Sequence, residues 1–273
     1  MATYNQIVSK EALNDSIFKL QIRVNQWAKH VEAGQFLMIR IEPKGERFPL
    51  TITETIDDCV VVIFKVIGYS TKQLSQCEIN DTLYEVLGPL GQPYPLDHIA
   101  TMVVIGGGVG NAITYAMAKH LHQQGISITY IGGFKSEQES FYLNEIQAIS
   151  HQQLFMFDQP SALGLTGNVI DGLNHLAKSQ TITHIFTAGP LPMMQAVVEF
   201  AKSHHAQVVV SLNPIMVDGI GMCGGCRVDI DSKVKFACVD GPEFDGLLVD
   251  FKQLIKRNKT YQKHACVLEK HHE

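Results

Sequence analysis

The sequence is poor in the features that mark specialised protein classes. Charged residues make up only 18% of the 273 residues, and 27 acidic side chains outnumber 22 basic ones, which gives a net charge of −5. Because a chain without a basic surplus is not built to follow a phosphate backbone, we predict no nucleic-acid partner. Only 10 prolines, together with 22 glycines that follow no repeat, exclude a collagen-like or low-complexity chain.

The sequence also lacks an unbroken apolar run of membrane-spanning length. The longest apolar stretch, residues 102–118, is interrupted by four glycines and Asn111, so a strand, a glycine turn and a helix explain it better. Residues 1–15 show no charged segment followed by an apolar one, as a secretory signal would. We therefore predict no membrane span and a cytoplasmic location.

Cysteines are too sparse for a disulfide scaffold, since the whole chain has six. Three of them crowd together near the carboxyl end, at Cys223, Cys226 and Cys238. In a reducing compartment such crowding indicates a metal site rather than disulfides.

The length predicts about two domains, at a typical size of roughly 150 residues each. Residues 1–97 hold several short β-branched or aromatic runs separated by turn residues, which predicts a small antiparallel β-barrel; the runs are 16–24, 35–41, 59–67 and 82–88. From residue 98 to 206, apolar strands alternate with helical patterns, which predicts a parallel sheet covered on both faces. The fold class is therefore α/β combined with all-β.

The last part of the chain has a different character. Residues 207–250 begin with an apolar run and continue with three cysteines, many glycines and little regular pattern, so we expect a small segment organised by a ligand. Residues 251–273 form a C-terminal extension rich in lysine and histidine, which we interpret as a solvated helix or a frayed end.

The cysteine segment has the spacing of an iron–sulfur site. Asp218, Cys223, Cys226 and Cys238 follow a ligand-x4-Cys-x2-Cys-x11-Cys pattern, which matches plant-type two-iron, two-sulfur clusters with aspartate in place of the first cysteine. A structural zinc ion held by three thiolates and a carboxylate is the alternative, although zinc sites usually show two short-spaced ligand pairs. Asp218 alone is equally well explained as a turn residue.

A glycine-rich turn in the second domain predicts a dinucleotide site. Gly107, Gly108 and Gly110 follow an apolar strand and open a helix, where a pyrophosphate can approach the backbone. Asn111 departs from the strict dinucleotide fingerprint. Gly189 and Pro190 end another strand of the same predicted sheet, at the edge where ligands bind.

Taken together, the motifs resemble those of a known family. They run in the order R-x-P-L-T, G-x-[ST]-T, G-P-L-G, G-G-G-x-G, A-G-P-x-x-M-M, and D-G-x-G-M-C-x-x-C with F-A-C-V-D-G-P-E-F-D-G. Over nearly the whole chain this order resembles the ferredoxin-reductase-like electron-transfer subunits. That family includes the dihydroorotate dehydrogenase electron-transfer subunit and the small subunit of NADH-dependent reduced ferredoxin:NADP oxidoreductase, also described as sulfide dehydrogenase. The second is more similar, because the dihydroorotate type would show cysteine at position 218.

The resemblance implies FAD on the barrel. It places near the isoalloxazine ring the residues Arg47, Pro49, Leu50 and Thr51, with Thr51 as the catalytic hydrogen-bond donor to flavin N5, and near the pyrophosphate Gly68, Ser70 and Thr71. In the wider superfamily the arginine usually lies three residues before the hydroxyl residue, whereas here the separation is four. Because a one-residue shift on a strand turns a side chain to the other face, the contact of Arg47 with phosphate stays open.

The resemblance also implies the other two cofactors. NAD(H) would bind at Gly107, Gly108, Gly110, Gly189 and Pro190, and a two-iron, two-sulfur (2Fe-2S) cluster would be held by Asp218, Cys223, Cys226 and Cys238.

We therefore predict an NAD(H)-dependent flavin and iron–sulfur oxidoreductase subunit. It would pass electrons between NAD(H), FAD and the cluster, to or from a larger flavin and iron–sulfur subunit. In the resembling enzyme this takes part in electron bifurcation with ferredoxin and NADP. Two alternatives stay open: an electron-transfer subunit of a dihydroorotate dehydrogenase or hydrogenase complex, and a zinc-stabilised nucleotide-binding regulator without redox turnover.

Overall fold

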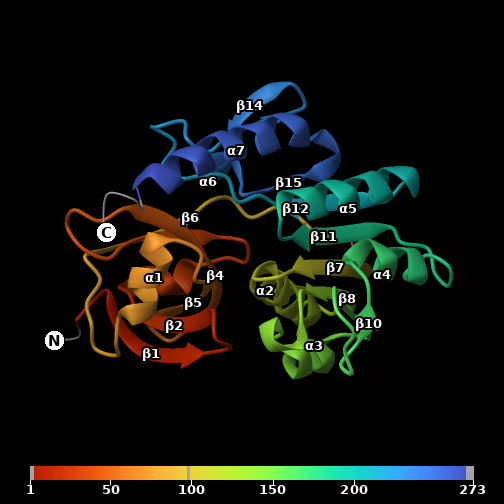
Figure 1. The fold of residues 1–273 in the computed structure, drawn as a ribbon, viewed down its shortest axis with the longest axis horizontal. Coiled ribbons are helices and arrows are strands. Elements are labelled where there is room, and N and C mark those ends of the chain that lie inside the picture. Colours follow the sequence, from red (N-terminus) through yellow and green to blue (C-terminus); the bar gives the residue numbers. More distant parts are fainter. Residues whose placement is uncertain (1–2, 97–98, 269–273) are drawn as a thin grey trace.

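The first part of the chain folds into a six-stranded antiparallel sheet (Figure 1). The computed structural model describes residues 3–96 and 99–268. In the order β1-β2-β5-β4-β3-β6, the sheet contains β1 (Gln6–Ala12), β2 (Ile17–Arg23), β5 (Cys59–Lys65), β4 (Arg47–Ile56), β3 (Phe36–Arg40) and β6 (Glu85–Leu90). The chain just before β6 returns to β1, where Ile7 N donates to Asp81 O at 2.9 Å and Leu83 N donates to Asn5 O at 2.9 Å. The predicted antiparallel barrel is confirmed.

Alternation along β4 sorts its side chains onto two faces. Phe48 and Leu50 pack against the apolar core of the barrel. Because successive residues of a strand point to opposite faces, Arg47, Pro49 and Thr51 lie together on the outer face. The one-residue difference in motif spacing therefore does not separate Arg47 from Thr51.

The neighbouring strand β3 continues this outer face. Met38 pairs with Pro49 across the ladder, and Phe36 pairs with Thr51. Met38 and Phe36 are 1% and 2% exposed, and both belong to a core shared with the rest of the molecule rather than to the core of the barrel. The outer face of β3 and β4 is thus the side on which the other parts of the chain are packed.

The second sheet has seven strands, in the order β10-β9-β8-β7-β11-β12-β15. They are β10 (Leu165–Thr166), β9 (Gln152–Phe157), β8 (Ser127–Phe134), β7 (Thr101–Gly107), β11 (His184–Ala188), β12 (Gln207–Ser211) and β15 (Glu243–Asp245). All neighbouring strands are parallel except β12 and β15. The predicted parallel sheet is confirmed.

Helices cover both faces of this sheet. On β7, Met102 and Val104 pack with α2 (Gly110–Gln123) and α3 (Leu143–Ile149), whereas Val103 and Ile105 pack with α4 (Val169–Leu176) and α5 (Leu191–Ser203). Burial on both faces explains the continuous apolar run of this strand in the sequence. Within the described residues, no helix combines the length and the apolar character needed to cross a bilayer.

The C-terminal segment lies across the barrel and the parallel sheet (Figure 1, blue). It contains a hairpin of β13 (Arg227–Ile230) and β14 (Lys233–Phe236), then α6 (Ala237–Asp240), β15 and α7 (Phe251–Leu268). Its core residues, among them Cys226, Cys238 and Phe244, are continuous with the core beneath α4 and α5. The segment therefore has no apolar core of its own.

The domain limits stay predictions. The first limit, between residues 97 and 98, lies outside the described residues. At the second, β12 pairs with β11 and β15 pairs with β12, so the parallel sheet continues past residue 206 into the C-terminal segment. Residues 251–268 form α7, as the helical interpretation of the extension requires, and residues 269–273 lie outside the description.

Candidate functional site

Two of the predicted cluster ligands meet in the interior. Cys226 and Cys238 are 1% and 2% exposed, and their Sγ atoms lie 3.2 Å apart. Two sulfurs that share one tetrahedral metal ion at about 2.3 Å lie about 3.7 Å apart, so a small outward movement is enough to admit the ion. Burial and the neighbouring Cys226 thiol raise the pKa of Cys238.

The other two predicted ligands form a second pair at the surface of the loop. Asp218 Oδ2 accepts a hydrogen bond from Cys223 N at 2.5 Å, and Asp218 Oδ1 accepts one from Ile220 N at 2.9 Å. Burial raises the pKa of Asp218, but these backbone donors outweigh it, and the pKa lies below its ordinary value. In this conformation Asp218 closes the turn, which is the alternative that the sequence left open.

The arrangement in two pairs fits a two-iron cluster better than a single ion. Among the residues that the structure describes, no three His, Cys, Asp or Glu side chains converge as the ligands of one metal ion. In a two-iron cluster each iron takes two protein ligands, and the loop provides one pair from Asp218 and Cys223 and another from Cys226 and Cys238. Positive φ angles of 84° at Gly221, within the first pair, and of 66° at Gly224, between the two pairs, let the chain turn tightly from one ligand to the next.

The cluster loop rests directly on the barrel. A Cβ atom on Gly219, next to Asp218, would lie 2.6 Å from Met38 Cγ and 3.1 Å from Leu90 Cδ1, so the loop backbone packs against β3 and β6. Met38 is the residue paired with Pro49 on the outer face of the barrel. The structure thus brings the predicted cluster ligands beside the predicted flavin face.

Arg47 belongs to the same region but already has a partner. Its guanidinium makes two hydrogen bonds to Glu85, Nε to Oε2 at 2.6 Å and Nη2 to Oε1 at 3.0 Å. The hydrogen bonds and charge of Glu85 raise the pKa of Arg47, with a smaller contribution from Asp218. Leu50 differs from the rest of the set, because its side chain points into the barrel core. Only Pro49 and Thr51 leave their side chains on the outer face without such an ion pair.

The predicted pyrophosphate segment forms the start of a helix. Gly68 is the N-cap of α1 (Tyr69–Gln76), and the Thr71 hydroxyl accepts hydrogen bonds from Ile67 N and Gly68 N. The Ser70 hydroxyl donates to Glu46. Both hydroxyls are therefore engaged, and the helix N-terminus is what this segment presents to a phosphate. A Cβ atom on Gly68 would meet nothing within 4 Å, so the space beside it is open.

The two glycine loops of the parallel sheet pack against each other. A Cβ atom on Gly107 would lie 2.3 Å from Met193 Sδ, and one on Gly110 would lie 2.4 Å from Ala188 O. Gly189, with φ of 156°, lies against Gly107, since its own Cβ would be 3.2 Å from Gly107 Cα. These glycines let neighbouring elements approach closely. Pro190 is the N-cap of α5 at the same edge.

Gly108 is the glycine of this loop that faces open space. Its φ is 55°, and a Cβ atom there would meet nothing within 4 Å. Asn111, which stands where the fingerprint expects a third glycine, is fully buried and donates from Nδ2 to Gly108 O at 3.0 Å and to Gly133 O at 3.1 Å. Asn111 thereby fixes the loop from its buried side. The open side at Gly108 is where a pyrophosphate can approach.

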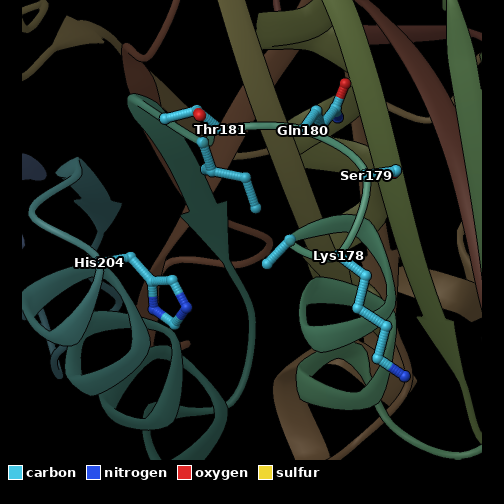
Figure 2. Close-up of a pocket in the computed structure, with 7 residues that line it drawn as sticks. Lys178, Ser179, Gln180, Thr181 and His204 are labelled. Carbon is cyan, nitrogen blue, oxygen red and sulfur yellow. The ribbon is translucent and has the colours of Figure 1, made fainter.

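A surface depression of about 370 Å³ lies elsewhere, between the end of α4 and the end of α5 (Figure 2). Lys178 and His204 stand on its two sides, and His204 is stacked on Phe200 with ring centroids 3.9 Å apart. The depression lies near the beginning of β11, opposite the edge where ligands of parallel sheets bind. It is therefore separate from the dinucleotide loop.

Some residues of these regions could not be found from the sequence. Glu85 pairs with Arg47 from a different strand. Glu243 on β15 is 2% exposed, and among the described residues its Oε1 has no hydrogen-bond partner. Burial raises the pKa of Glu243 to about 8, although Tyr94 N donates to its Oε2 at 3.3 Å. No spacing in the sequence indicates either contact, because both join distant segments.

Comparison with known proteins decides the family. Residues 213–250 match the family model of the iron–sulfur cluster binding domain of dihydroorotate dehydrogenase B. A protein of Thermotoga maritima named dihydroorotate dehydrogenase B (NAD(+)), electron transfer subunit homolog, is 38% identical over 94% of this chain and 92% of its own length. This chain belongs to the family of dihydroorotate dehydrogenase B electron transfer subunits and their homologues.

Other members of the family and more distant folds agree. The electron transfer subunit of Listeria monocytogenes serotype 4b is 30% identical over 89% of this chain and 97% of its own length. A solved structure, described as NADH-dependent reduced ferredoxin-NADP oxidoreductase and studied for flavin-based electron bifurcation, superposes with a TM-score of 0.92. It is 36% identical and covers 100% of this chain and 99% of its own. Amycolatopsis cytochrome P450 reductase GcoB, 18% identical with a TM-score of 0.63 over 74% of this chain and 65% of its own, shares the fold.

The comparisons confirm the predicted family, the ferredoxin-reductase-like fold and the electron-transfer role. The match over residues 213–250 is to an iron–sulfur domain, so it favours the cluster over the zinc alternative. The roles of the single residues stay predictions.

Proposed function

We propose that this chain carries electrons between NAD(H), FAD and a 2Fe-2S cluster as the electron-transfer subunit of a larger oxidoreductase. The observation that carries the proposal is the packing of the cluster loop on the barrel. Gly219, next to Asp218, contacts Met38, and Met38 is paired with Pro49 on the face that also bears Thr51. A flavin on this face would lie beside the cluster, so electrons would need to cross only a short distance.

The flavin face has the side chains that an isoalloxazine ring requires. Within residues 3–96 and 99–268 the Thr51 hydroxyl makes no hydrogen bond, so it can donate to flavin N5. Gly68 leaves open space at the N-terminus of α1 for the flavin pyrophosphate, and Gly108 leaves open space at the dinucleotide loop. Bound FAD supplies the conversion between a two-electron hydride donor and a one-electron carrier.

The cluster loop also provides a surface for the partner subunit. Its exposed side chains are largely apolar and include Val217 at 54%, Ile220 at 50% and Met222 at 83% exposure. Apolar side chains gathered around a redox centre support docking of a protein partner. We propose a larger flavin and iron–sulfur subunit as this partner, ferredoxin as a further electron carrier in the complex, and a cytoplasmic location.

Cofactor analysis of the anaerobically purified full chain tests the proposal. We expect one FAD, two irons and two acid-labile sulfides per chain, flavin bands in the visible spectrum, and bleaching of these bands by NADH. A colourless protein with stoichiometric zinc would overturn the proposal and support the alternative, a zinc-stabilised nucleotide-binding regulator.

A second candidate is the electron-transfer subunit of a dihydroorotate dehydrogenase. The names of the Thermotoga and Listeria relatives favour it, whereas aspartate at position 218 disfavours it. Purification with the natural partner separates the two candidates. Orotate formation with NAD+ as acceptor would support the dihydroorotate dehydrogenase. NADPH-dependent reduction of both ferredoxin and NAD+ would support the NADH-dependent reduced ferredoxin:NADP oxidoreductase.

A further inference from the structure

The C-terminal helix α7 is packed onto the cluster segment. Phe251 and Leu254, in its first turn, are 5% and 3% exposed. They belong to the same apolar core as Cys226 and Cys238. The helix also packs against β13, the strand that leaves Cys226. This extension is therefore part of the support of the cluster loop, and not only the solvated helix that the sequence suggests.

One side chain of α7 reaches the backbone on both sides of a predicted ligand. Arg257 Nη2 donates to Gly225 O at 3.1 Å, and Arg257 Nη1 donates to Arg227 O at 3.1 Å. Gly225 and Arg227 are the two neighbours of Cys226 in the chain. A planar guanidinium with donors in a fixed fork holds two acceptors at a set separation, which an ammonium group cannot do.

The same guanidinium places a charge next to this ligand. Among the side chains that the structure describes, no carboxylate forms an ion pair with Arg257. Two ferric ions, two sulfides, three thiolates and one carboxylate sum to an anion, whose negative charge increases on reduction. The potential of an iron–sulfur cluster depends on its net charge, on hydrogen bonds and on exposure. A cation beside Cys226 favours the reduced form.

We propose that Arg257 is a positioning residue for the cluster, fixing the peptides on either side of Cys226 and favouring cluster reduction through its charge. The inference rests on the proposed function, because it assumes that the loop holds a cluster. It adds a role for a residue that lies outside the ligand motif and far from it in sequence.

Three variants of the full chain, purified anaerobically with cluster and FAD, separate the fork from the charge. Arg257→Gln removes the charge, and Arg257→Lys keeps the charge but removes the fork. Lys259→Gln is the matched control, since Lys259 is exposed on the same helix and loses the same charge. The measurements are the rate of iron loss to a ferrous chelator, and the cluster reduction potential from a titration followed by electron paramagnetic resonance.

For Arg257→Gln we expect iron loss faster by about 10- to 100-fold, in proportion to the loss of metal affinity that follows removal of a group orienting a ligand, and a more negative cluster potential. For Arg257→Lys we expect faster iron loss with the potential unchanged, and for Lys259→Gln neither effect. An unchanged potential in Arg257→Gln would overturn the proposal, because Arg257 would then only anchor α7 to the loop and its charge would not act on the cluster. If Arg257→Gln does not fold, unchanged iron loss in Arg257→Lys also overturns it. Absence of iron from the wild-type chain would instead overturn the proposed function.

Discussion

The dinucleotide loop and the cluster loop are both rich in glycine, yet they are held in different ways. The first is enclosed on its inner side, where Gly107 and Gly110 pack against Met193 and Ala188 and the buried Asn111 donates two hydrogen bonds to the backbone. The cluster loop packs on Met38 only at Gly219. Beyond it, Ile220 and Met222 are 50% and 83% exposed, and the loop is held by the hydrogen bonds that Asp218 accepts and Arg257 donates. We infer that the dinucleotide loop is formed before its ligand arrives, whereas the cluster loop is completed by its ligand.

The largest expected effect comes from removing a ligand of the cluster loop. In Cys226→Ala, electron transfer to a one-electron acceptor protein should fall below detection, because the outlet of the chain is lost. Reduction of the flavin by NADH should continue, since the dinucleotide loop and the flavin face do not depend on Cys226. Stopped-flow absorbance measures both steps, and unchanged transfer to the acceptor would contradict the proposed order of electron carriers.

The next effect concerns Glu243 on β15, the strand that joins the cluster segment to the nucleotide sheet. Glu243 lies against Gly34 of the barrel and pairs with Ser211 of the sheet. Its pKa is about 8 in the folded chain against an ordinary value of 4.5. Between these values folding takes up a proton, so the stability of the wild type falls as pH rises, by up to about 1.4 kcal/mol per pH unit, and levels off above pH 8.

The variant Glu243→Gln lacks this titration. It should match the wild type near pH 5, where both side chains are neutral when folded, apart from the small cost of ionisation in the unfolded wild type. It should exceed the wild type by roughly 4–5 kcal/mol at pH 9, because the whole interval between 4.5 and about 8 then contributes about 1.4 kcal/mol per pH unit. Thermal unfolding at several pH values measures the difference. Parallel pH profiles for the two proteins would show that Glu243 does not control the pH dependence of stability.

A smaller effect tests the packed loop. Gly110→Ala should destabilise the chain by about 1–3 kcal/mol, because the new methyl group would overlap the Ala188 carbonyl. Gly108→Ala should cost about 1 kcal/mol for its left-handed backbone, but it should raise the KM for NADH, since the methyl group enters the open space. Thermal midpoints and NADH kinetics compare the two variants, and a larger KM effect from Gly110→Ala would reverse their assigned roles.

The smallest effect on the fold is expected for Asp218→Asn. The amide oxygen can still accept one of the two hydrogen bonds from the loop backbone, whereas the amide nitrogen cannot accept the other, so the free energy of unfolding should fall by no more than about 1 kcal/mol. If Asp218 is a ligand, the visible and paramagnetic spectra of the cluster should shift, because the neutral amide binds iron less well. Spectra identical to those of the wild type would leave Asp218 with its role in the turn alone.

Local pattern was enough to predict most of the fold. The runs that became β2, β3, β5 and β7 are apolar and well bounded, and the alternation of strands and helices predicts the parallel sheet. The strand β4 is harder to recognise in the sequence, because Pro49 and four polar residues after Leu50 interrupt its apolar pattern. The helix α1 has little helical signal in the sequence, because Gly68 precedes it and few apolar residues follow.

The ligands of the candidate site were also predicted from spacing, but their surroundings were not. Asn111 takes the place of a glycine because it is tied to Gly133, and the Tyr130 hydroxyl donates to the backbone O of Asn111 at 3.2 Å. Those partners come from β8, whose position beside β7 is a property of the folded chain. The same holds for Arg257, whose acceptors lie about thirty residues earlier in the sequence.

The strand β15 makes the folding of the nucleotide sheet depend on the cluster segment. It comes from the segment that carries the cluster ligands, yet it supplies the outer strand of the nucleotide sheet through its pairing with β12. A chain whose cluster segment has not folded would leave the backbone of β12 unpaired at an open edge, where it can join another chain. Incorporation of iron would thus also protect the nucleotide domain from aggregation, because chains without the cluster would expose the unpaired edge of β12.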